Sequence, residues 1–274
     1  MKVPLGGVIG CPVGHSRSPR LHGAWLREYG LAGHYVPLHV EPEDLENVLR
    51  TMPQMGFVGV NVTIPYKERA LELADIVSPE ARAIGAANTL QFVDGSIVAD
   101  NTDGYGFMAN LIECAPEWDP KSGPALVLGA GGAARAVLVA LAGAGVSEIR
   151  LTNRTFNRAH VLAAELEAPI TVVDWSDRAE AADGVALVVN TTSLGMQGQP
   201  LLDFPPSALQ MGMVVTDLVY TPLETGLLRA ARARGCTTVD GLGMLLHQAV
   251  PGFQRWFGRT PQVTQALRAT VLAP

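Results

Sequence analysis

The segment that most constrains this fold is an apolar run at Ala125–Leu128, followed at once by a glycine-rich turn and an Ala/Val/Leu-rich stretch over 132–142. A buried strand, such a turn and a helix are typical of the start of a dinucleotide-binding βαβ unit. Gly129 permits the tight turn, and Gly131 lets the backbone approach a pyrophosphate at the helix amino end. The predicted cofactor contacts in this turn are Gly129, Ala130, Gly131, Gly132 and Ala133. A glycine-rich turn alone is a weak signal, but its context favours the dinucleotide interpretation.

The end of the next predicted strand, Ile149–Thr152, indicates which dinucleotide binds. An acidic residue there would hold the ribose 2′-hydroxyl of NAD, but the sequence continues instead with Asn153, Arg154 and Thr155, and Arg158 follows one turn later. Because guanidinium groups pair with phosphate through a planar fork, this pattern favours the 2′-phosphate of NADP. The alternative is that both arginines are ordinary solvated residues at a helix start.

The alternation of strand and helix patterns predicts an α/β protein with two domains. The first hundred residues indicate an N-terminal α/β domain with a mainly parallel sheet, and the later ones a Rossmann-type doubly wound sheet of six strands. In the first part, strands are predicted at Leu5–Ile9, His34–Val40 and Phe57–Ile64, a hairpin at Thr89–Val93 and Ile97–Ala99, and helices at Ser18–Tyr29 (Ser18 as N-cap), Pro42–Met52 and Tyr66–Ala74. Later strands are predicted at Ile170–Val173, Ala186–Asn190, Met213–Asp217 and Thr237–Val239, and later helices at Gly104–Ile112, Leu242–Trp256 and Gln262–Leu272.

Length and composition exclude several classes of protein. The 274 residues suit two domains, and the net charge of −6 argues against a nucleic-acid partner. The three cysteines are too widely spaced for a CxxC site or a disulfide framework, which favours a reducing compartment. No apolar stretch reaches the roughly 20 residues that span a bilayer. We therefore expect a soluble, cytoplasmic protein without a membrane or nucleic-acid partner.

Four polar segments lie outside the glycine-rich unit, at residues 15–19, 61–67, 88–89 and 101–104. They place paired hydroxyls before a helix, alternating polar side chains and a lysine after a strand, and two Asn-Thr pairs at predicted strand boundaries. Each segment alone has a structural explanation as a helix cap, a turn or a solvated charge.

Taken together, these segments give the chain a resemblance to the shikimate dehydrogenase family along nearly its whole length. The matching segments, in order, are GCPVGHSRSP (10–19), GVNVTIPYK (59–67), IGAANT (84–89), DNTDGYGF (100–107), GAGGAAR (129–135), NRT (153–155), NTTSLGM (190–196), DLVYTPLET (217–225) and GLGMLLHQA (241–249). Nine ordered matches are highly specific.

The resemblance implies a substrate domain at 1–101, completed by 242–274, and an NADP-binding domain at 102–241, with the substrate in the cleft between them. The implied reaction is the reversible reduction of 3-dehydroshikimate to shikimate, a step toward chorismate and aromatic amino acids. The resemblance assigns the catalytic pair to Lys67 and Asp103, the substrate carboxylate to Ser16, Ser18 and Tyr220, and the ring hydroxyls to Asn61, Thr63, Asn88 and Gln248.

The resemblance also adds cofactor contacts near the nicotinamide and its ribose. These are Thr191, Thr192 and Ser193, which follow a predicted strand, and Leu218, Gly241 and Met244. Met244 fits a core position in a helix equally well. His247 has no matching role, and we expect it to be structural.

The residue types agree with this chemistry. Lys67 can supply the proton and stabilise the developing alkoxide, and Asp103 can orient Lys67 and a substrate hydroxyl. Because nicotinamide carries the redox chemistry, no metal is needed, and no His/Cys/Asp cluster in the sequence suggests one.

The chain departs from the family pattern at one position, and three alternative functions remain open. Arg17 stands between the two serines where the family often has Leu, and we expect its side chain to face solvent. The alternatives are a quinate/shikimate dehydrogenase that uses NAD, an enzyme for another hydroxylated cyclohexene acid, and a dinucleotide-sensing module without turnover. The sequence leaves a monomer and a homodimer equally open.

Overall fold

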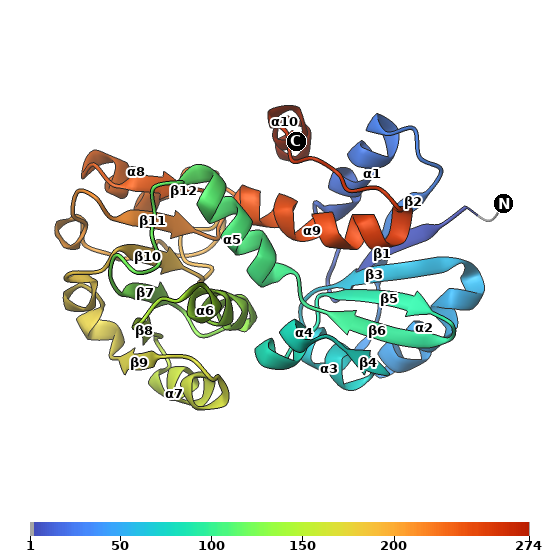
Figure 1. Cartoon of the computed structure of the whole chain (residues 1–274), viewed down its shortest axis with the longest axis horizontal. Coiled ribbons are helices and arrows are strands. Elements are labelled where there is room, and N and C mark those ends of the chain that lie inside the picture. The colour runs from blue at the N-terminus through green and yellow to red at the C-terminus, as the bar shows by residue number, and fades with distance from the viewer. Residues whose placement is uncertain (1–2, 274) are drawn as a thin grey trace. The chain divides into compact units, whose positions relative to one another are not determined.

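A computed structural model describes residues 3–273, and these form two compact α/β units (Figure 1). The first unit runs up to Thr102 and resumes at Leu246, and the second unit is Asp103–Leu245. The α/β class predicted from the sequence is confirmed. The predicted boundaries, 101/102 and 241/242, lie within a few residues of these limits.

The first unit contains a six-stranded sheet of order β2-β1-β3-β5-β6-β4. Three of its neighbouring pairs are parallel, and the two that involve β5 are antiparallel. The elements are β1 (Leu5–Gly10), α1 (Ser18–Glu28), β2 (His34–His39), η1 (Pro42–Asp44), α2 (Leu45–Thr51), η2 (Met52–Met55), β3 (Phe57–Val62), α3 (Lys67–Glu72), β4 (Ile76–Val77), α4 (Pro79–Ile84), β5 (Thr89–Val93), β6 (Ser96–Asp100) and α10 (Gln265–Leu272).

The second unit contains an entirely parallel six-stranded sheet of order β12-β11-β10-β7-β8-β9, which is a doubly wound arrangement. Its elements are α5 (Asp103–Cys114), β7 (Ala125–Leu128), α6 (Gly132–Ala144), β8 (Ile149–Thr152), α7 (Phe156–Glu165), β9 (Ile170–Val173), η3 (Trp175–Arg178), η4 (Glu180–Ala182), β10 (Leu187–Asn190), η5 (Pro206–Ala208), β11 (Val214–Asp217), α8 (Gly226–Ala233) and β12 (Thr237–Val239). The last boundary between the units, at 245/246, falls inside α9 (Gly241–Phe257).

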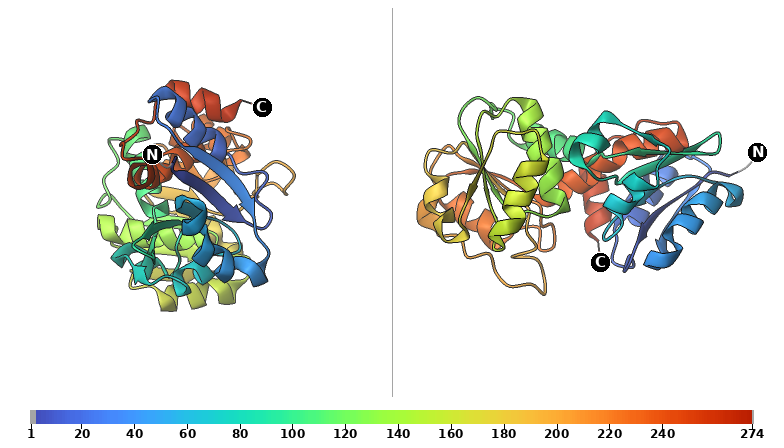
Figure 2. Two further views of the ribbon diagram at one scale, coloured as in Figure 1. Left: turned by 90° about the vertical axis from the view of Figure 1, so that its right-hand side faces the viewer. Right: turned by 90° about the horizontal axis from the view of Figure 1, so that it is seen from below.

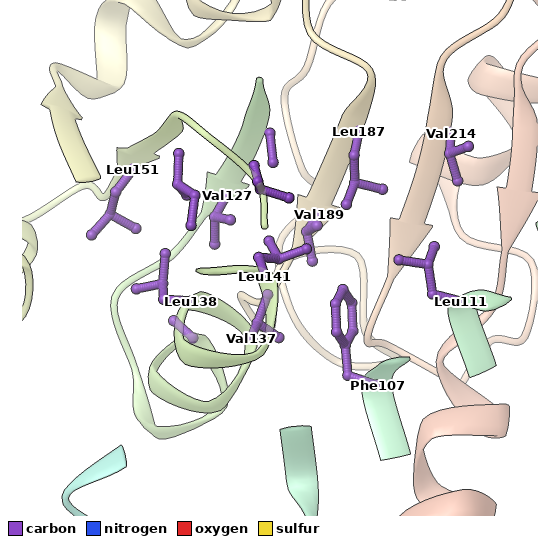
Figure 3. Packing of buried hydrophobic residues seen from close by; sticks show 14 of the residues in the cluster. Phe107, Leu111, Val127, Val137, Leu138, Leu141, Leu151, Leu187, Val189 and Val214 are labelled. Carbon is purple, nitrogen blue, oxygen red and sulfur yellow. The ribbon is translucent and has the colours of Figure 1, made fainter. Parts of the chain in front are cut away.

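Helices cover both faces of the second unit's sheet, because alternate residues of each buried strand point to opposite faces. Val127 and Val189 pack with α5 and α6 in one apolar cluster (Figure 3). Leu126 and Val188 pack on the other face with α8 and η4. The sheet lies between these helix layers in the right-hand view of Figure 2. This double burial explains why the strands read as continuous apolar runs.

The first unit also has apolar clusters on both faces of its sheet. Ile9 and Val62 pack under α2 and α3, and Val8 and Trp256 belong to a separate cluster. Among residues 3–273, no helix has the length and apolar character that a membrane crossing requires.

Three local features of the first unit differ from what the sequence predicts. The N-cap of α1 is Arg17, and Ser18 is the first helical residue. The single helix predicted at Pro42–Met52 is a short α-helix flanked by two 3-10 turns. Elements β4 and α4 were not predicted, because a two-residue strand and a six-residue helix are too short to show a period.

The side chain of Arg17 does not face solvent as predicted. It is half-buried, and its guanidinium donates a hydrogen bond to the carbonyl oxygen of Val271. Arg20 donates likewise to the carbonyl of Ala273. Both arginines therefore lie at the carboxyl end of α10, where unpaired carbonyl groups and the helix dipole favour positive charge.

Candidate active site

The glycine-rich turn between β7 and α6 requires glycine for two reasons at its first position. Gly129 has φ +107°, and a Cβ there would lie 2.7 Å from the Thr191 hydroxyl oxygen and 2.8 Å from Cγ2 of Thr192. At Gly131 and Gly132, by contrast, an added Cβ would meet no atom within 4 Å. The turn is therefore packed on its inner side and open in front of the first turn of α6.

The neighbouring strand ends hold this turn in place. The amide N–H of Ala130 donates to Oδ1 of Asn153 (3.3 Å), and the Asn153 amide donates to the carbonyl of Thr155 (2.9 Å). The hydroxyl of Thr191 donates to the carbonyl of Leu128 (2.8 Å). The cofactor residues predicted on three strand ends therefore share one edge of the sheet.

Arg154 and Arg158 follow β8 and are both exposed. Within residues 3–273, neither forms an ion pair with a carboxylate, so their guanidinium groups can meet an anion from solution. Thr155 is the N-cap of α7, but its side chain does not cap the helix. An anion here meets two charges that have no competing acidic partner.

A buried polar cluster lies behind this edge, formed by Asn190, Asp217 and Thr225. Oδ1 of Asp217 accepts from the Asn190 amide (2.9 Å), and Oδ2 accepts from the Thr225 hydroxyl (2.7 Å). Asn190 Oδ1 in turn accepts from the N–H and the hydroxyl of Thr192 (3.1 and 2.7 Å). Burial raises the pKa of Asp217 to about 6, although its hydrogen bonds oppose the shift. The cluster as a unit has no role among the sequence predictions.

The other predicted cofactor contacts also belong to the second unit. Leu218 and Met244 are half-buried and pack against the apolar cluster under α5 and α6, while Ser193 is exposed. A Cβ at Gly241 would lie 2.3 Å from the carbonyl oxygen of Leu218, so only glycine allows this approach of α9 to β11. Tyr220, predicted to contact substrate, is half-buried in this unit.

In the first unit, the two predicted hydroxyls lie at the amino end of α1. Ser18 is 6% exposed, and its N–H donates to the hydroxyl oxygen of Ser16 (3.3 Å). The Ser18 side chain is in hydrogen-bond contact with the Tyr35 hydroxyl, which donates to Oδ1 of Asn61 (2.7 Å). Tyr35 therefore connects a predicted carboxylate contact to a predicted ring-hydroxyl contact.

A second set of hydrogen bonds joins the predicted amides of the first unit. The Asn61 amide donates to Oγ1 of Thr89 and to the carbonyl of Asn88 (both 3.1 Å). Oδ1 of Asn88 accepts from the N–H of Thr102 (2.8 Å), and its amide donates to Oε1 of Gln248 (3.4 Å). Three distant segments thus bring Asn61, Asn88 and Gln248 together in a buried cluster of neutral groups.

The predicted catalytic residues begin two helices. Lys67 is the first residue of α3 and is half-buried. Its carbonyl accepts from the N–H of Ala87 (2.8 Å), one residue before Asn88. Asp103 is the first residue of α5, is 7% exposed, and directly follows Thr102. Thr63 is half-buried, and its N–H donates to the carbonyl of Ile9 (2.9 Å).

Tyr35 is the residue that sequence reasoning missed in this unit. It is 7% exposed and stacks on His22 with ring centroids 4.0 Å apart. Burial lowers the pKa of His22 to about 3 and raises the pKa of Tyr35, so both side chains are neutral. The only sequence signal was an aromatic residue in a predicted strand, which any strand can contain.

The second unit, with its parallel sheet, glycine-rich turn and polar strand ends, defines a dinucleotide-binding protein of the doubly wound α/β class. Residues 8–90 match the family description "Shikimate dehydrogenase substrate binding domain", residues 117–196 match "Shikimate / quinate 5-dehydrogenase", and residues 241–272 match "Shikimate 5'-dehydrogenase C-terminal domain". The chain belongs to the shikimate dehydrogenase family.

Similar proteins cover the whole chain. Shikimate dehydrogenase (NADP(+)) of a Ruegeria species is 61% identical over 272 residues, which is 99% of both chains. The structure of the Thermus thermophilus shikimate 5-dehydrogenase with NADP(H) and shikimate is 38% identical, with a TM-score of 0.86, over 97% of this chain and 98% of that one. The structure of quinate dehydrogenase from Corynebacterium glutamicum with NAD is 36% identical, with a TM-score of 0.90, over 98% of both chains.

Proposed function

We propose that the protein catalyses the reversible NADPH-dependent reduction of 3-dehydroshikimate to shikimate, a step toward chorismate and the aromatic amino acids. The observation that carries the substrate class is the buried cluster of Asn61, Asn88 and Gln248 in the first unit. Amide groups both donate and accept hydrogen bonds, so they suit the ring hydroxyls of a polyhydroxylated cyclohexene acid. The family of the chain and its 61% identity to an NADP-dependent shikimate dehydrogenase support the same reaction.

The residues of the second unit fit a bound dinucleotide phosphate. The open front of the turn at Gly131 and Gly132 leaves room for the pyrophosphate at the amino end of α6. Arg154 and Arg158 would hold the 2′-phosphate through charge-assisted hydrogen bonds. Bound NADPH would supply the hydride.

The chain's own contribution is binding, orientation and proton transfer. Ser16 and Ser18 would donate hydrogen bonds to the substrate carboxylate. Lys67 would donate a proton to the carbonyl oxygen as it becomes a hydroxyl, and would accept it in the reverse direction. Asp103 would accept hydrogen bonds from the ammonium group and from a substrate hydroxyl, which orients both groups for that proton transfer.

Quinate oxidation with NAD is the second candidate, favoured by the similarity to the Corynebacterium enzyme. Two features of the chain support the first candidate instead. The residue after β8 is Asn153, where an NAD site would have an acidic residue, and the two arginines beside it carry positive charge.

A steady-state assay of all four combinations of shikimate or quinate with NADP or NAD tests this proposal, with the absorbance of reduced nicotinamide as the readout. We expect a large kcat/KM preference for shikimate with NADP. Comparable rates with quinate or NAD would assign the protein to the second candidate. No turnover in any combination, with NADP still bound, would leave a binding module or a different substrate.

The proposed compartment is the cytoplasm. Cys11, Cys114 and Cys236 form no disulfide with one another, which agrees with a reducing environment.

A further inference from the structure

A cysteine, a histidine and a glutamate converge on one edge of the first unit, and none of them is assigned to the reaction. Sγ of Cys11 lies 3.7 Å from Nε2 of His39 and 3.9 Å from Oε2 of Glu41. The same His39 nitrogen lies 3.0 Å from Oε1 of Glu41. The three potential ligand atoms all lie within 4.8 Å of one another.

The strand register of the sheet creates this cluster. β1 and β2 are parallel neighbours with Gly10 opposite His39, so Cys11 emerges beside the end of β2. Residues two apart in an extended chain share a face, so Glu41 projects on the same side as His39. Val40 between them is buried in the apolar cluster under α2 and α3.

The backbone around the cluster is anchored. The N–H of Cys11 donates to the carbonyl of Ile64 (3.3 Å), and the Tyr66 hydroxyl donates to the carbonyl of Val40 (2.5 Å). The Cys11 side chain also packs against the apolar cluster, while the side chains of His39 and Glu41 are about half exposed (53% and 55%). The ligand atoms therefore project from fixed positions toward solvent.

The surroundings of the cluster are negative. Glu41 is the N-cap of η1, and Glu43 lies in its first turn, two residues further on. A cation at the cluster would meet two carboxylates and a thiol that becomes a thiolate on binding.

We propose that Cys11, His39 and Glu41 form a binding site for one Zn²⁺ ion, with a fourth position open to water. In tetrahedral zinc sites, ligand distances of about 2.0–2.3 Å place neighbouring ligand atoms roughly 3.3–3.7 Å apart. The 3.7 Å between Cys11 and His39 lies within that range. One Glu41 oxygen is 3.0 Å from His39 and the other is 3.9 Å from Cys11, so rotation of the exposed His39 and Glu41 side chains would bring a single carboxylate oxygen into place. Thiolate and imidazole ligands select zinc over magnesium and calcium, which prefer oxygen.

None of the three ligands belongs to the predicted catalytic or substrate residues, so a metal titration tests this site separately from the proposed reaction. Sequence reasoning found no such cluster because 28 residues separate Cys11 from His39. Only the pairing of β1 with β2 brings them together.

Titration of the full-length, metal-free protein with Co²⁺ followed by Zn²⁺ tests the site. We expect one equivalent of Co²⁺ to produce thiolate-to-cobalt charge-transfer absorption and tetrahedral ligand-field bands, both lost when Zn²⁺ displaces it. Cys11→Ser should abolish the charge-transfer absorption. His39→Ala should lower the Zn²⁺ affinity more than about 100-fold, because losing an outer-shell partner already costs 10–100-fold.

The matched control is Cys114→Ser, which removes an exposed thiol outside the cluster and should leave the titration unchanged. Circular dichroism and the steady-state assay with NADP establish that each variant is folded. If Cys11→Ser does not fold, His39→Ala tests the site in its place. Absence of the charge-transfer absorption in the parent protein overturns the proposal. Its persistence in Cys11→Ser, or an unchanged Zn²⁺ affinity in His39→Ala, overturns it as well.

Discussion

Each of the two units carries a buried polar cluster at the ends of its strands, but the two clusters differ in charge. In the first unit, Tyr35, Asn61 and Asn88 are joined by hydroxyls and amides, all of them neutral. In the second unit, Asn190 and Thr225 surround the carboxyl group of Asp217. Both clusters satisfy buried polar groups, as a stable interior requires.

The difference indicates what each cluster does. The neutral cluster contains residues proposed to bind substrate, and neutral amides can exchange their partners for ligand hydroxyls without exposing a buried charge. The Asp217 carboxyl group lies behind the cofactor residues and accepts hydrogen bonds from Asn190, Val219 and Thr225, none of which is a proposed ligand residue. Its hydrogen bond with the Asn190 amide orients the Asn190 oxygen that accepts from Thr192 beside Gly129, so Asp217 maintains the shape of the glycine-rich turn.

The largest expected effect is on kcat, and it distinguishes a catalytic role of Lys67 in the first unit from a role in substrate binding. Lys67→Ala should lower kcat by about 10²–10⁴-fold, the range for a general acid, with little change in the KM for shikimate. Steady-state kinetics measures both constants, and Lys121→Ala, at an exposed loop position, is the matched control. A sharp rise in KM with kcat maintained would make Lys67 a binding residue only.

The second prediction tests the packing of the glycine-rich turn. Gly129→Ala combines a left-handed backbone with contacts of 2.7 and 2.8 Å to Thr191 and Thr192, so it should lower the unfolding free energy by about 2–5 kcal/mol. Gly132→Ala meets no atom within 4 Å and should change it by less than about 0.5 kcal/mol. Urea unfolding of both variants checks this contrast, and equal losses would contradict it.

The exposed arginines should affect affinity without affecting stability. Arg154→Ala should weaken NADP binding by about 10–100-fold, the size of one charge-assisted hydrogen bond, and leave NAD binding almost unchanged. Isothermal titration with each dinucleotide measures this. Arg229→Ala, whose side chain is 72% exposed on α8, is the control, and equal loss for NADP and NAD would remove the 2′-phosphate assignment.

The charge of the second cluster predicts a pH dependence. Because burial raises the pKa of Asp217 from 3.8 to about 6, its contribution to stability is complete below pH 3.8 and is lost as the pH rises through about 6. The slope cannot exceed about 1.4 kcal/mol per pH unit for one proton. Asp217→Asn should remove this slope in urea unfolding between pH 4.5 and 7, while Asp203→Asn, at an exposed carboxylate, should keep it. A slope that persists in Asp217→Asn would contradict the assignment.

The sequence predicted the second unit better than the first for a physical reason. A doubly wound sheet repeats one local pattern, and the glycine-rich turn lies within six consecutive residues, so contiguous signals suffice. The polar cluster of the first unit depends on pairings between distant strands, and Tyr35 joins Ser18 to Asn61 only because β2 lies beside β1 and β1 beside β3. The N-cap at Arg17 was missed for a related reason, since the Ser18 side chain contacts Tyr35 rather than the helix backbone.

The smallest effect tests whether Tyr35 positions the substrate residues or only supports the fold. Tyr35→Phe keeps the stacking on His22 but removes the hydrogen bonds of the hydroxyl with Asn61 and Ser18, so the unfolding free energy should fall by about 1 kcal/mol. The KM for shikimate should rise about fivefold, the equivalent of that energy, while kcat and the KM for NADP are maintained. Tyr29→Phe is the matched control, because the Tyr29 hydroxyl accepts a hydrogen bond from the N–H of Gln262 (3.0 Å) and contacts none of the proposed ligand residues. If both variants lose stability equally and neither changes the KM for shikimate, Tyr35 is purely structural. A higher KM for shikimate in Tyr35→Phe alone would show that the neutral cluster acts as one unit in binding. The Tyr35 hydroxyl, which is not a proposed ligand contact, would then set the position of the Asn61 amide, which is.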